Sequence, residues 1–389
     1  MKGILTPDGL LANPALSRLD KQSQELVLAF AEGLTNDVQK QASQTDAIRS
    51  FLSKANPTVG DVHVSTELTN LSIAYIQDRA NFQASMAGMF GVANQAGFYT
   101  EYDRADMFRG NPDAALLAPA TESAGGGFKI KQENGFFTKV YSWHKDVDEQ
   151  LMAQQTVGDP VDDALSYVMQ ILYIIREQIF DAAIMIGSLW GLDKQGVASS
   201  PTGNQFLQWN DSSSTPRADL SAQCVRMHSQ TGMWPNTLAL QPYVLSALLL
   251  NAEITEAFKY TTAGAVPSLQ ALAESLMVGA VAGATTPSIK IAGAVEATSA
   301  EGAATDTFDY IVGKKALLAY LAPRPSLRTP TAWINFAWTG FLGANAFGYR
   351  VKDLEDEIRH VPHRIEGDMA VDIKPVAPDL GTYFYDVVA

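Results

Sequence analysis

The chain has little cysteine, little charge and no uninterrupted apolar run, and each shortage excludes a class of protein. Cys224 is the one cysteine among 389 residues, so internal disulfides and thiolate metal clusters are excluded. Charged residues make up 18%, below the usual ~25%, which fits burial against neighbouring subunits, although an alanine-rich monomer would look similar. The most apolar long segment, 165–186, contains Arg176, Glu177 and Asp181, and residues 1–12 lack the pattern of a signal peptide. We therefore expect no membrane partner.

Positive charge is also scarce. Lysine and arginine number 28 against 42 acidic residues, which gives a net charge of −14. A general nucleic-acid binder needs a surplus of basic residues to neutralise phosphates. The balance instead fits a surface that lies close to nucleic acid without binding it tightly.

Motifs for catalysis and cofactor binding are missing as well. The glycines in "TESAGGGFKIK" (121–131) are followed by phenylalanine and a predicted strand, whereas a phosphate-binding loop ends in Gly-Lys-Ser/Thr and opens a helix. We interpret them as a flexible segment. His360 and His363 are separated by Pro362 and have no further ligand nearby, so they are interpreted as surface histidines. We predict no catalytic residue, no cofactor and no metal, and a protein that is not an enzyme.

The first two-fifths of the chain reads as an arm followed by strands. Residues 1–60 are polar with a helical period, and they contain too few apolar residues for a core of their own. Residues 97–143 are rich in β-prone residues, and Asn134-Gly135 is a strong signal for a hairpin turn. Because an isolated two-stranded ribbon is marginally stable in water, this ribbon must pack on another surface, in its own chain or a neighbour's.

The clearest element is a long helix over residues 160–186. Asp159 is suited to cap it, Pro160 to occupy its first position, and Gly187 to end it. At ~1.5 Å per residue it would be roughly 40 Å long, which suits a structural spine. Its apolar side chains recur at intervals of three and four residues: Leu165, Val168, Met169, Leu172, Ile175 and Ile179.

The remainder mixes helices and strands, so the fold class is predicted as α+β. "PNTLAL" (235–240) reads as a strand, and "PYVLSALLLNAEI" (242–254) and "PSLQALAESL" (267–276) read as helices. "MAVDIKP" (369–375) alternates apolar and polar residues as a half-buried strand does.

This order of parts resembles the major capsid proteins of tailed bacteriophages. "LAPATESAGGGF" and "VYSWHKDV" resemble the stretch in which these proteins run from an extended loop back to the body. "WPNTLALQPYVLSALLLNAEI" resembles the opening of their axial domain, and "VGKKALLAYLAPRPSLRTPTAWINFAW" with "GYRV" resembles their C-terminal half. "VAPDLGTYFYDVV" resembles the closing strand, and the likeness covers most of residues 91–389.

The resemblance implies a division of the chain into five parts. These are a largely helical N-terminal arm (1–95), an extended β-hairpin loop (96–145), a peripheral domain with the spine helix (146–219), an α/β axial domain (220–345), and a return strand of the peripheral domain with a C-terminal strand (346–389).

The resemblance also implies a structural protein that self-assembles as pentamers and hexamers into an icosahedral shell around double-stranded DNA. The expected partners are further copies of the chain, a portal protein, possible scaffolding and decoration proteins, and packaged DNA without sequence-specific contacts. The expected location is the virion, after assembly in the host cytoplasm. A shell that encloses a cargo enzyme, as in encapsulin nanocompartments, is the alternative.

In such shells the extended loop lies on an adjacent subunit, and the glycines would let the base of the loop bend. Some of these relatives join their subunits covalently through a loop lysine, but no partner asparagine or glutamate can be placed in this sequence. The residues expected at the subunit interface are Tyr99, Tyr102, Arg104, Phe108, Glu122, Gly125, Gly126, Gly127, Lys129, Lys131, Asn134 and Gly135.

Overall fold

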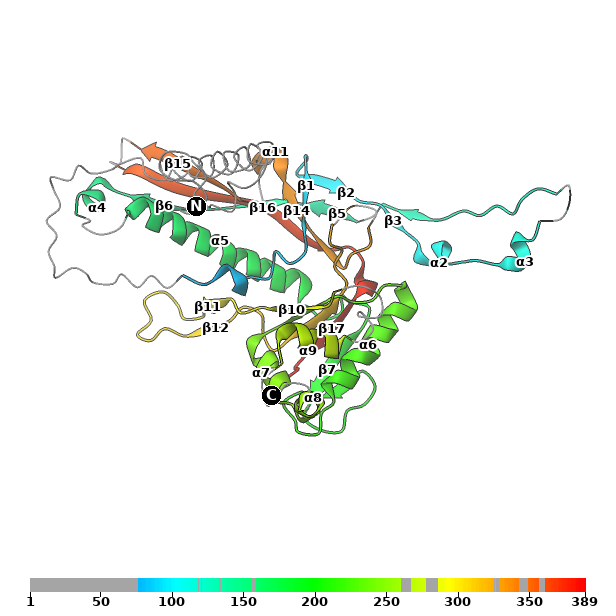
Figure 1. Ribbon diagram of the computed structural model, residues 1–389. Coiled ribbons are helices and arrows are strands. Elements are labelled where there is room, and N and C mark those ends of the chain that lie inside the picture. The colour runs from blue at the N-terminus through cyan, green and yellow to red at the C-terminus, as the bar shows by residue number, and fades with distance from the viewer. Residues whose placement is uncertain are drawn as a thin grey trace, which may run out of the picture. The chain divides into compact units, whose positions relative to one another are not determined.

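All of the described structure belongs to the second of two units of the chain, residues 71–389. The structure is a computed structural model (Figure 1). The predicted arm lies outside the described residues as far as residue 75. The described residues are 76–117, 119, 121–132, 134–154, 159–259, 267–277, 286–324, 326, 329–342, 349–356 and 361–389.

Helices and strands alternate along these residues, as an α+β chain requires. The helices are η2 (Arg79–Asn81), α2 (Arg104–Met107), α3 (Pro112–Ala115), α4 (Glu149–Gln154), α5 (Pro160–Ile184), α6 (Pro216–Thr231), α7 (Pro242–Leu250), α8 (Ala252–Phe258), α9 (Leu269–Leu276), α11 (Thr339–Leu342) and η4 (Pro378–Leu380). The strands are β1 (Met89–Val92), β2 (Ala96–Phe98), β3 (Glu101–Tyr102), β4 (Ile130–Lys131), β5 (Gly135–Phe137), β6 (Lys139–Val147), β7 (Asp193–Val197), β8 (Gln205–Leu207), β9 (Thr237–Leu240), β10 (Ser288–Ile291), β11 (Val295–Ala297), β12 (Phe308–Tyr310), β13 (Ala316–Ala319), β14 (Trp333–Trp338), β15 (Tyr349–Asp356), β16 (Val361–Pro375) and β17 (Gly381–Tyr385). None of the described helices is long and apolar enough to cross a membrane.

The predicted spine helix is α5. The Asp159 carboxylate accepts a hydrogen bond from the Val161 amide at 2.9 Å, and Pro160 occupies the first position, so the start of the helix is as predicted. The helix ends at Ile184, three residues before the predicted stop at Gly187. Its apolar stripe packs against the sheet that contains β16. Val168 and Leu172 are fully buried there, and the other four predicted stripe residues are partly buried: Leu165, Met169, Ile175 and Ile179.

The sheet beneath α5 is built around the long strand β16. Val371 of β16 lies opposite Lys139 of β6 and Ala337 of β14, so these two strands flank it on opposite edges. Further along, Met369 lies opposite both Tyr349 of β15 and Tyr141 of β6. Strands β14 and β15 therefore follow one another along one edge of β16, while β6 occupies the other edge (Figure 1).

A glycine in β16 sets the distance between the sheet and α5. A Cβ at Gly367 would lie 2.7 Å from side-chain carbons of both Val168 and Leu172, closer than real Cβ atoms approach. The helix can therefore seat its two fully buried residues directly against the strand only because position 367 has no side chain.

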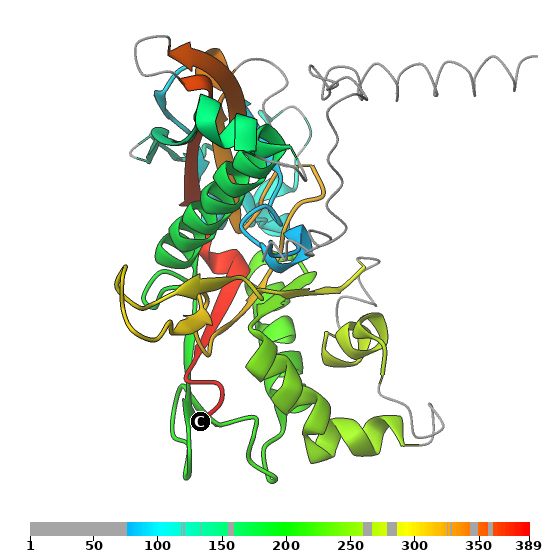
Figure 2. The ribbon, with the colours of Figure 1, turned by 90° about the vertical axis from the view of Figure 1, so that its left-hand side faces the viewer.

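The second sheet has six strands in the order β10-β9-β13-β17-β7-β8. One of its faces contributes to an apolar cluster in which Leu238 and Leu318 from the sheet pack with Leu248 of α7 and Leu272 of α9. In Figure 2, α6 and α7 lie beside this sheet and the C-terminus lies at its lower end. Strands β7 and β8 come from the predicted peripheral range and β17 from the predicted C-terminal range, so boundaries at 219 and 345 would cut through this sheet. The five ranges remain predictions.

The predicted turn at Asn134-Gly135 is wrong. Strand β4, before this dipeptide, pairs with β3, and β5, after it, pairs with β2. Both β4 and β5 therefore lie on the same side of the hairpin, opposite β3 and β2, and Gly135 is the first residue of β5 rather than a turn residue. The hairpin is closed by the much longer segment between β3 and β4.

Candidate assembly interface

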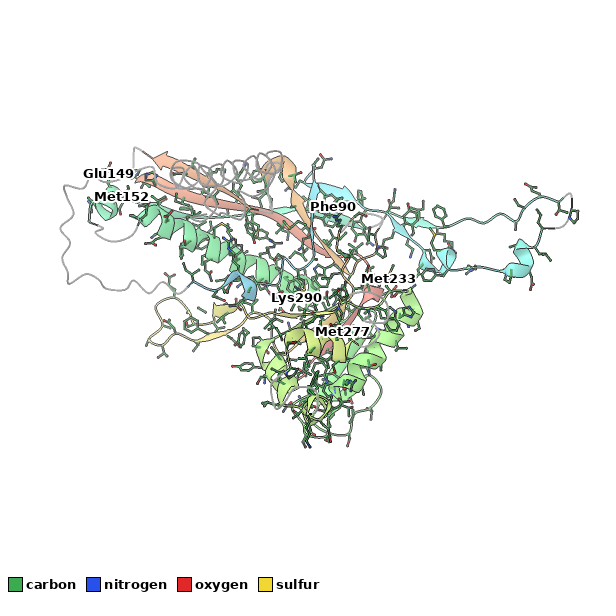
Figure 3. The ribbon with its side chains drawn as sticks, viewed as in Figure 1. Phe90, Glu149, Met152, Met233, Met277 and Lys290 are labelled. Carbon is green, nitrogen blue, oxygen red and sulfur yellow. The ribbon has the colours of Figure 1, made fainter. Side chains whose placement is uncertain are left out.

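The predicted extended loop leaves the body as two antiparallel legs. The outgoing leg carries β2, β3, α2 and α3, and the returning leg carries β4 and β5 before it enters β6 (Figure 1). In Figure 3 the side chains of the far half of this loop stand clear of the body, whereas those between α5 and the sheet are crowded. We refer to residues 103–129 as the distal loop.

The base of the loop is held by aromatic packing. The Phe136 ring stacks on Phe336 of β14 with centroids 4.6 Å apart, and Tyr99 stacks on the same ring at 6.1 Å. The Tyr99 hydroxyl donates to the Pro375 carbonyl oxygen at 3.3 Å, and burial, with Glu101 nearby, raises the pKa of Tyr99. These contacts bury Tyr99, so this residue stabilises its own subunit.

A charged network fixes the returning strand beyond the base. Asp368 of β16 accepts from Ser142 of β6 at 2.9 Å and pairs with Arg350 at 2.6 Å and Lys352 at 2.8 Å, both on β15. Burial alone would raise the pKa of Asp368, but the hydrogen bonds from Lys352, Arg350 and Ser142 outweigh it and lower the pKa. Strand β6 is thereby connected across β16 to β15.

Weaker contacts hold the two legs together further out. The Tyr102 and Phe128 rings lie 5.6 Å apart, and the Lys129 amide donates to the Asp106 carboxylate at 3.1 Å. Arg104 of α2 pairs with Asp379 of η4 at 2.8 Å, which joins the start of the distal loop to the body. Both of these side chains are substantially exposed, so this ion pair holds the loop only weakly.

The distal loop and its flanking residues present large apolar side chains that their own chain leaves exposed. Leu116 is 84% exposed and Phe108 is 63% exposed. Exposed apolar residues gathered on one projection are typical of a binding surface, whereas single ones are ordinary. The others in this group are Phe98, Tyr102, Met107, Leu117, Phe128 and Ile130.

Four of the residues predicted for the subunit interface have a structural role within their own chain, and the other eight are exposed. Tyr99 is buried, and Asn134 donates from its side chain to Glu101 at 2.7 Å within the loop. Arg104 contacts its own body through Asp379, and Gly135 begins β5. The rest are exposed or lie along the far part of the loop: Tyr102, Phe108, Glu122, Gly125, Gly126, Gly127, Lys129 and Lys131.

The three glycines lie in the distal loop, between α3 and β4, and not at the base as predicted. A Cβ at any of the three would have no neighbour within 4 Å, and none has a positive φ. Within one subunit nothing requires glycine there. A role in approaching another backbone stays a prediction.

Sequence reasoning missed the stacked pair Phe136 and Phe336 at the base and the exposed Leu116 and Leu117. Phe136 and Phe336 are far apart in the sequence, and no local pattern pairs them. Leu116 and Leu117 did carry a signal, because a thin two-stranded ribbon has no core in which two adjacent leucines between Pro112 and Pro119 could both be buried.

Within the described ranges, no three His, Cys, Asp or Glu residues could together hold a metal ion. His363 instead contacts Asp353 across β15 and β16, with Nδ1 and Oδ2 2.9 Å apart, while His360 lies outside the described residues. Cys224 is fully buried, and burial raises the pKa of its thiol to about 12, so it is an inert core residue.

The chain matches no family model and no curated protein sequence. Its fold does match solved structures. A phage-related protein from Bordetella bronchiseptica RB50 is similar with a TM-score of 0.59 and 17% identity, over 80% of this chain and 94% of that one. The capsid of cyanophage P-SCSP1u is similar with a TM-score of 0.50 and 11% identity, over 86% and 93%. An encapsulin complex from Synechococcus elongatus PCC 7942 is more distant, with a TM-score of 0.45 and 10% identity over 87% and 94%. The chain therefore has the α+β fold of phage capsid proteins.

Proposed function

We propose that this protein is the structural subunit of a shell, and that it self-assembles by laying its distal loop on an adjacent copy. The observation that carries the proposal is the contrast within one loop. Its base is packed and hydrogen-bonded to its own body, whereas its far half leaves Phe108 and Leu116 largely exposed. A segment with this distribution is positioned by one subunit and covered by another.

The energetics of a closed shell favour such a loop. Permanent interfaces bury ~2,000–5,000 Å² or more, and apolar burial contributes ~25 cal/mol per Å² before the costs of association. Each loop contact can be weak, because closure of the shell multiplies it. The low charge content of the chain, 18%, agrees with a subunit that covers much of its surface with neighbours.

The finer form of the proposal is a bacteriophage capsid built from pentamers and hexamers around double-stranded DNA. It is supported by the fold match to a phage capsid and by the net charge of −14, which keeps an inner wall from binding phosphates tightly. Portal, scaffolding and decoration proteins are the partners that this form implies, and the virion is the location. No sequence-specific contact with DNA is proposed.

Electron microscopy of the expressed full chain tests both levels of the proposal. Closed particles with five- and six-fold clusters of subunits are the expected result. A stable lone monomer at high concentration, with the distal loop protected from proteolysis, would contradict self-assembly. Particles from the natural source then separate the two kinds of shell, because packaged double-stranded DNA supports a capsid and an enclosed enzyme supports the encapsulin-like alternative.

A further inference from the structure

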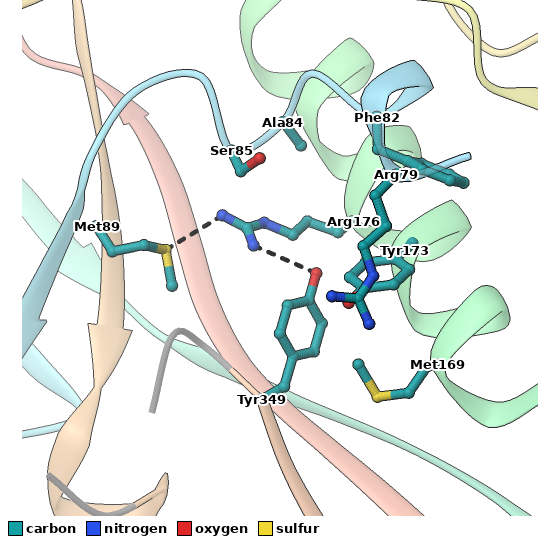
Figure 4. Close-up of a pocket in the computed structure, with 9 residues that line it drawn as sticks. All are labelled: Arg79, Phe82, Ala84, Ser85, Met89, Met169, Tyr173, Arg176 and Tyr349. Carbon is teal, nitrogen blue, oxygen red and sulfur yellow. Dashed lines mark hydrogen bonds between the residues drawn. The ribbon is translucent and has the colours of Figure 1, made fainter. Parts of the chain in front are cut away.

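A cavity of about 730 Å³ opens between the segment around η2, helix α5 and the first residue of β15 (Figure 4). Its size falls within the range of small-molecule sites, ~300–1,000 Å³. Aromatic and thioether side chains form much of its wall, and two guanidinium groups lie within it (Figure 4). Six of the lining residues carry the inference: Arg79, Phe82, Met89, Tyr173, Arg176 and Tyr349.

Arg176 is buried in this wall without an anionic hydrogen-bond partner among the described residues. It is 5% exposed, and its guanidinium donates to the Tyr349 hydroxyl oxygen at 3.2 Å and to the Met89 sulfur at 3.1 Å. Both acceptors are neutral, and the third donor, Nε, has no hydrogen-bond partner although it is buried. A buried guanidinium is costly unless an anion compensates it.

Arg79 adds a second positive charge from the exposed side. Its Cζ lies 5.5 Å from the centroid of the Tyr173 ring, and Arg176 Cζ lies 5.5 Å from the centroid of the Tyr349 ring. The two tyrosine rings contact each other edge to face at 5.3 Å. The arginines therefore flank one pair of touching rings, and neither forms an ion pair with any residue that the structure describes.

The carboxylates nearest in sequence accept hydrogen bonds from backbone amides, and Glu177 interacts with Arg176 only through its charge. Asp78 accepts from the Ala80 amide at 3.0 Å, and Glu177 accepts from the Ala84 amide at 2.8 Å. Burial raises the pKa of Glu177 to about 7, so much of this carboxyl is uncharged at neutral pH. The cavity thus keeps positive charge within a chain whose net charge is −14.

We propose that this cavity binds a small organic anion, in which a carboxylate or phosphate group sits on an apolar body. A guanidinium offers paired donors that match the oxygens of either group. The exposed guanidinium of Arg79 is the donor for it, and the buried guanidinium of Arg176 adds positive charge in the wall. Phe82 and Met89 line the wall against which the apolar body lies.

The test titrates the full chain with benzoate and phenyl phosphate and measures heat of binding. Benzyl alcohol serves as the neutral probe of similar size. Both anions are expected to bind in the millimolar range or tighter, more weakly at high salt, and the alcohol at least tenfold more weakly. Arg79→Gln is expected to weaken anion binding by about tenfold or more, because it removes a charged donor. The fold should be retained, because the Arg79 side chain is exposed.

Arg324→Gln is the matched control, since it removes one positive charge from an exposed position outside the cavity and should leave binding unchanged. Arg176→Lys, checked for folding by circular dichroism, keeps the charge but loses the hydrogen bonds that hold Tyr349 and Met89 in the wall, and should also weaken binding. The proposal is overturned if neither anion binds up to about 10 mM, if benzyl alcohol binds as well as benzoate, or if Arg79→Gln binds as tightly as the parent chain. None of these outcomes depends on whether the chain forms a shell.

Discussion

Replacing two exposed apolar residues of the distal loop by serine should prevent assembly without unfolding the subunit. Fully burying a leucine or phenylalanine side chain contributes about 1.5–3 kcal/mol. Phe108 is 63% exposed and Leu116 is 84% exposed, so their burial against a neighbour would contribute about 3 kcal/mol together in each loop. A loss of that size weakens a single contact roughly 100-fold, and the effect would be repeated at every contact of the proposed shell.

The assay compares Phe108→Ser/Leu116→Ser with the parent chain by light scattering over a range of concentrations. Thermal unfolding of the unassembled subunit should be nearly unchanged, because both side chains already face solvent in one chain. Phe108→Leu/Leu116→Met is the matched control, which keeps the apolar area and should still assemble. A folded serine variant that assembles at the parent concentration would refute the proposed docking of the loop.

Three further predictions concern the body of the subunit. Gly367→Ala should destabilise the fold by about 1–3 kcal/mol, measured by urea unfolding, because its Cβ would collide with α5; an unchanged midpoint would contradict the close packing. Asp368→Asn should cost about 2–3 kcal/mol at pH 7 by weakening the contact with Arg350. The pKa of Asp368 is lowered, so its contribution is present above the ordinary carboxyl range and is lost as pH falls through the folded value; the difference between parent and variant should shrink in strong acid. The pKa of Glu177 is raised from 4.5 to about 7, so the free energy of unfolding should fall by up to about 3 kcal/mol as pH rises from about 4.5 through 7. Glu177→Gln can still accept the hydrogen bond from the Ala84 amide but does not titrate, so it should lack this decline. If the stabilities of the parent chain and Glu177→Gln change in parallel with pH, this prediction is wrong.

The sequence predicts elements well where the signals are local. Asp159 and Pro160 define the start of α5 because a cap and a first-position proline act on adjacent backbone groups. The spacing of Val168 and Leu172 correctly identifies the buried face, since a helix repeats its own side every three to four residues.

Strand pairing was less accessible, because it is decided by residues that are distant in the sequence. Asn134-Gly135 has the chemistry of a tight turn, yet the flanking strands find longer-range partners in β2 and β3. The stacking of Phe136 on Phe336 shows what competes with the local preference. A dipeptide supplies a preference of a few kcal/mol at most, and aromatic burial against the body is of similar size.

The buried charges on α5 also escaped interpretation. Arg176 and Glu177 were used only to argue against a membrane span, although adjacent opposite charges within an apolar stripe are themselves a signal. The structure shows why they are there. Glu177 faces the Ala84 segment and Arg176 faces the cavity, so each serves a different neighbour of the helix.

The position of β6 limits how the subunit can change shape. Residues 139–145 of this strand are the last part of the predicted loop, and every residue of β6 pairs with β16. The loop is consequently no hinged flap, because swinging it from its root would break a full ladder of backbone hydrogen bonds. If neighbouring copies shift during the life of a particle, strain has to be absorbed beyond β3 and β4, or the whole subunit has to rotate as one piece.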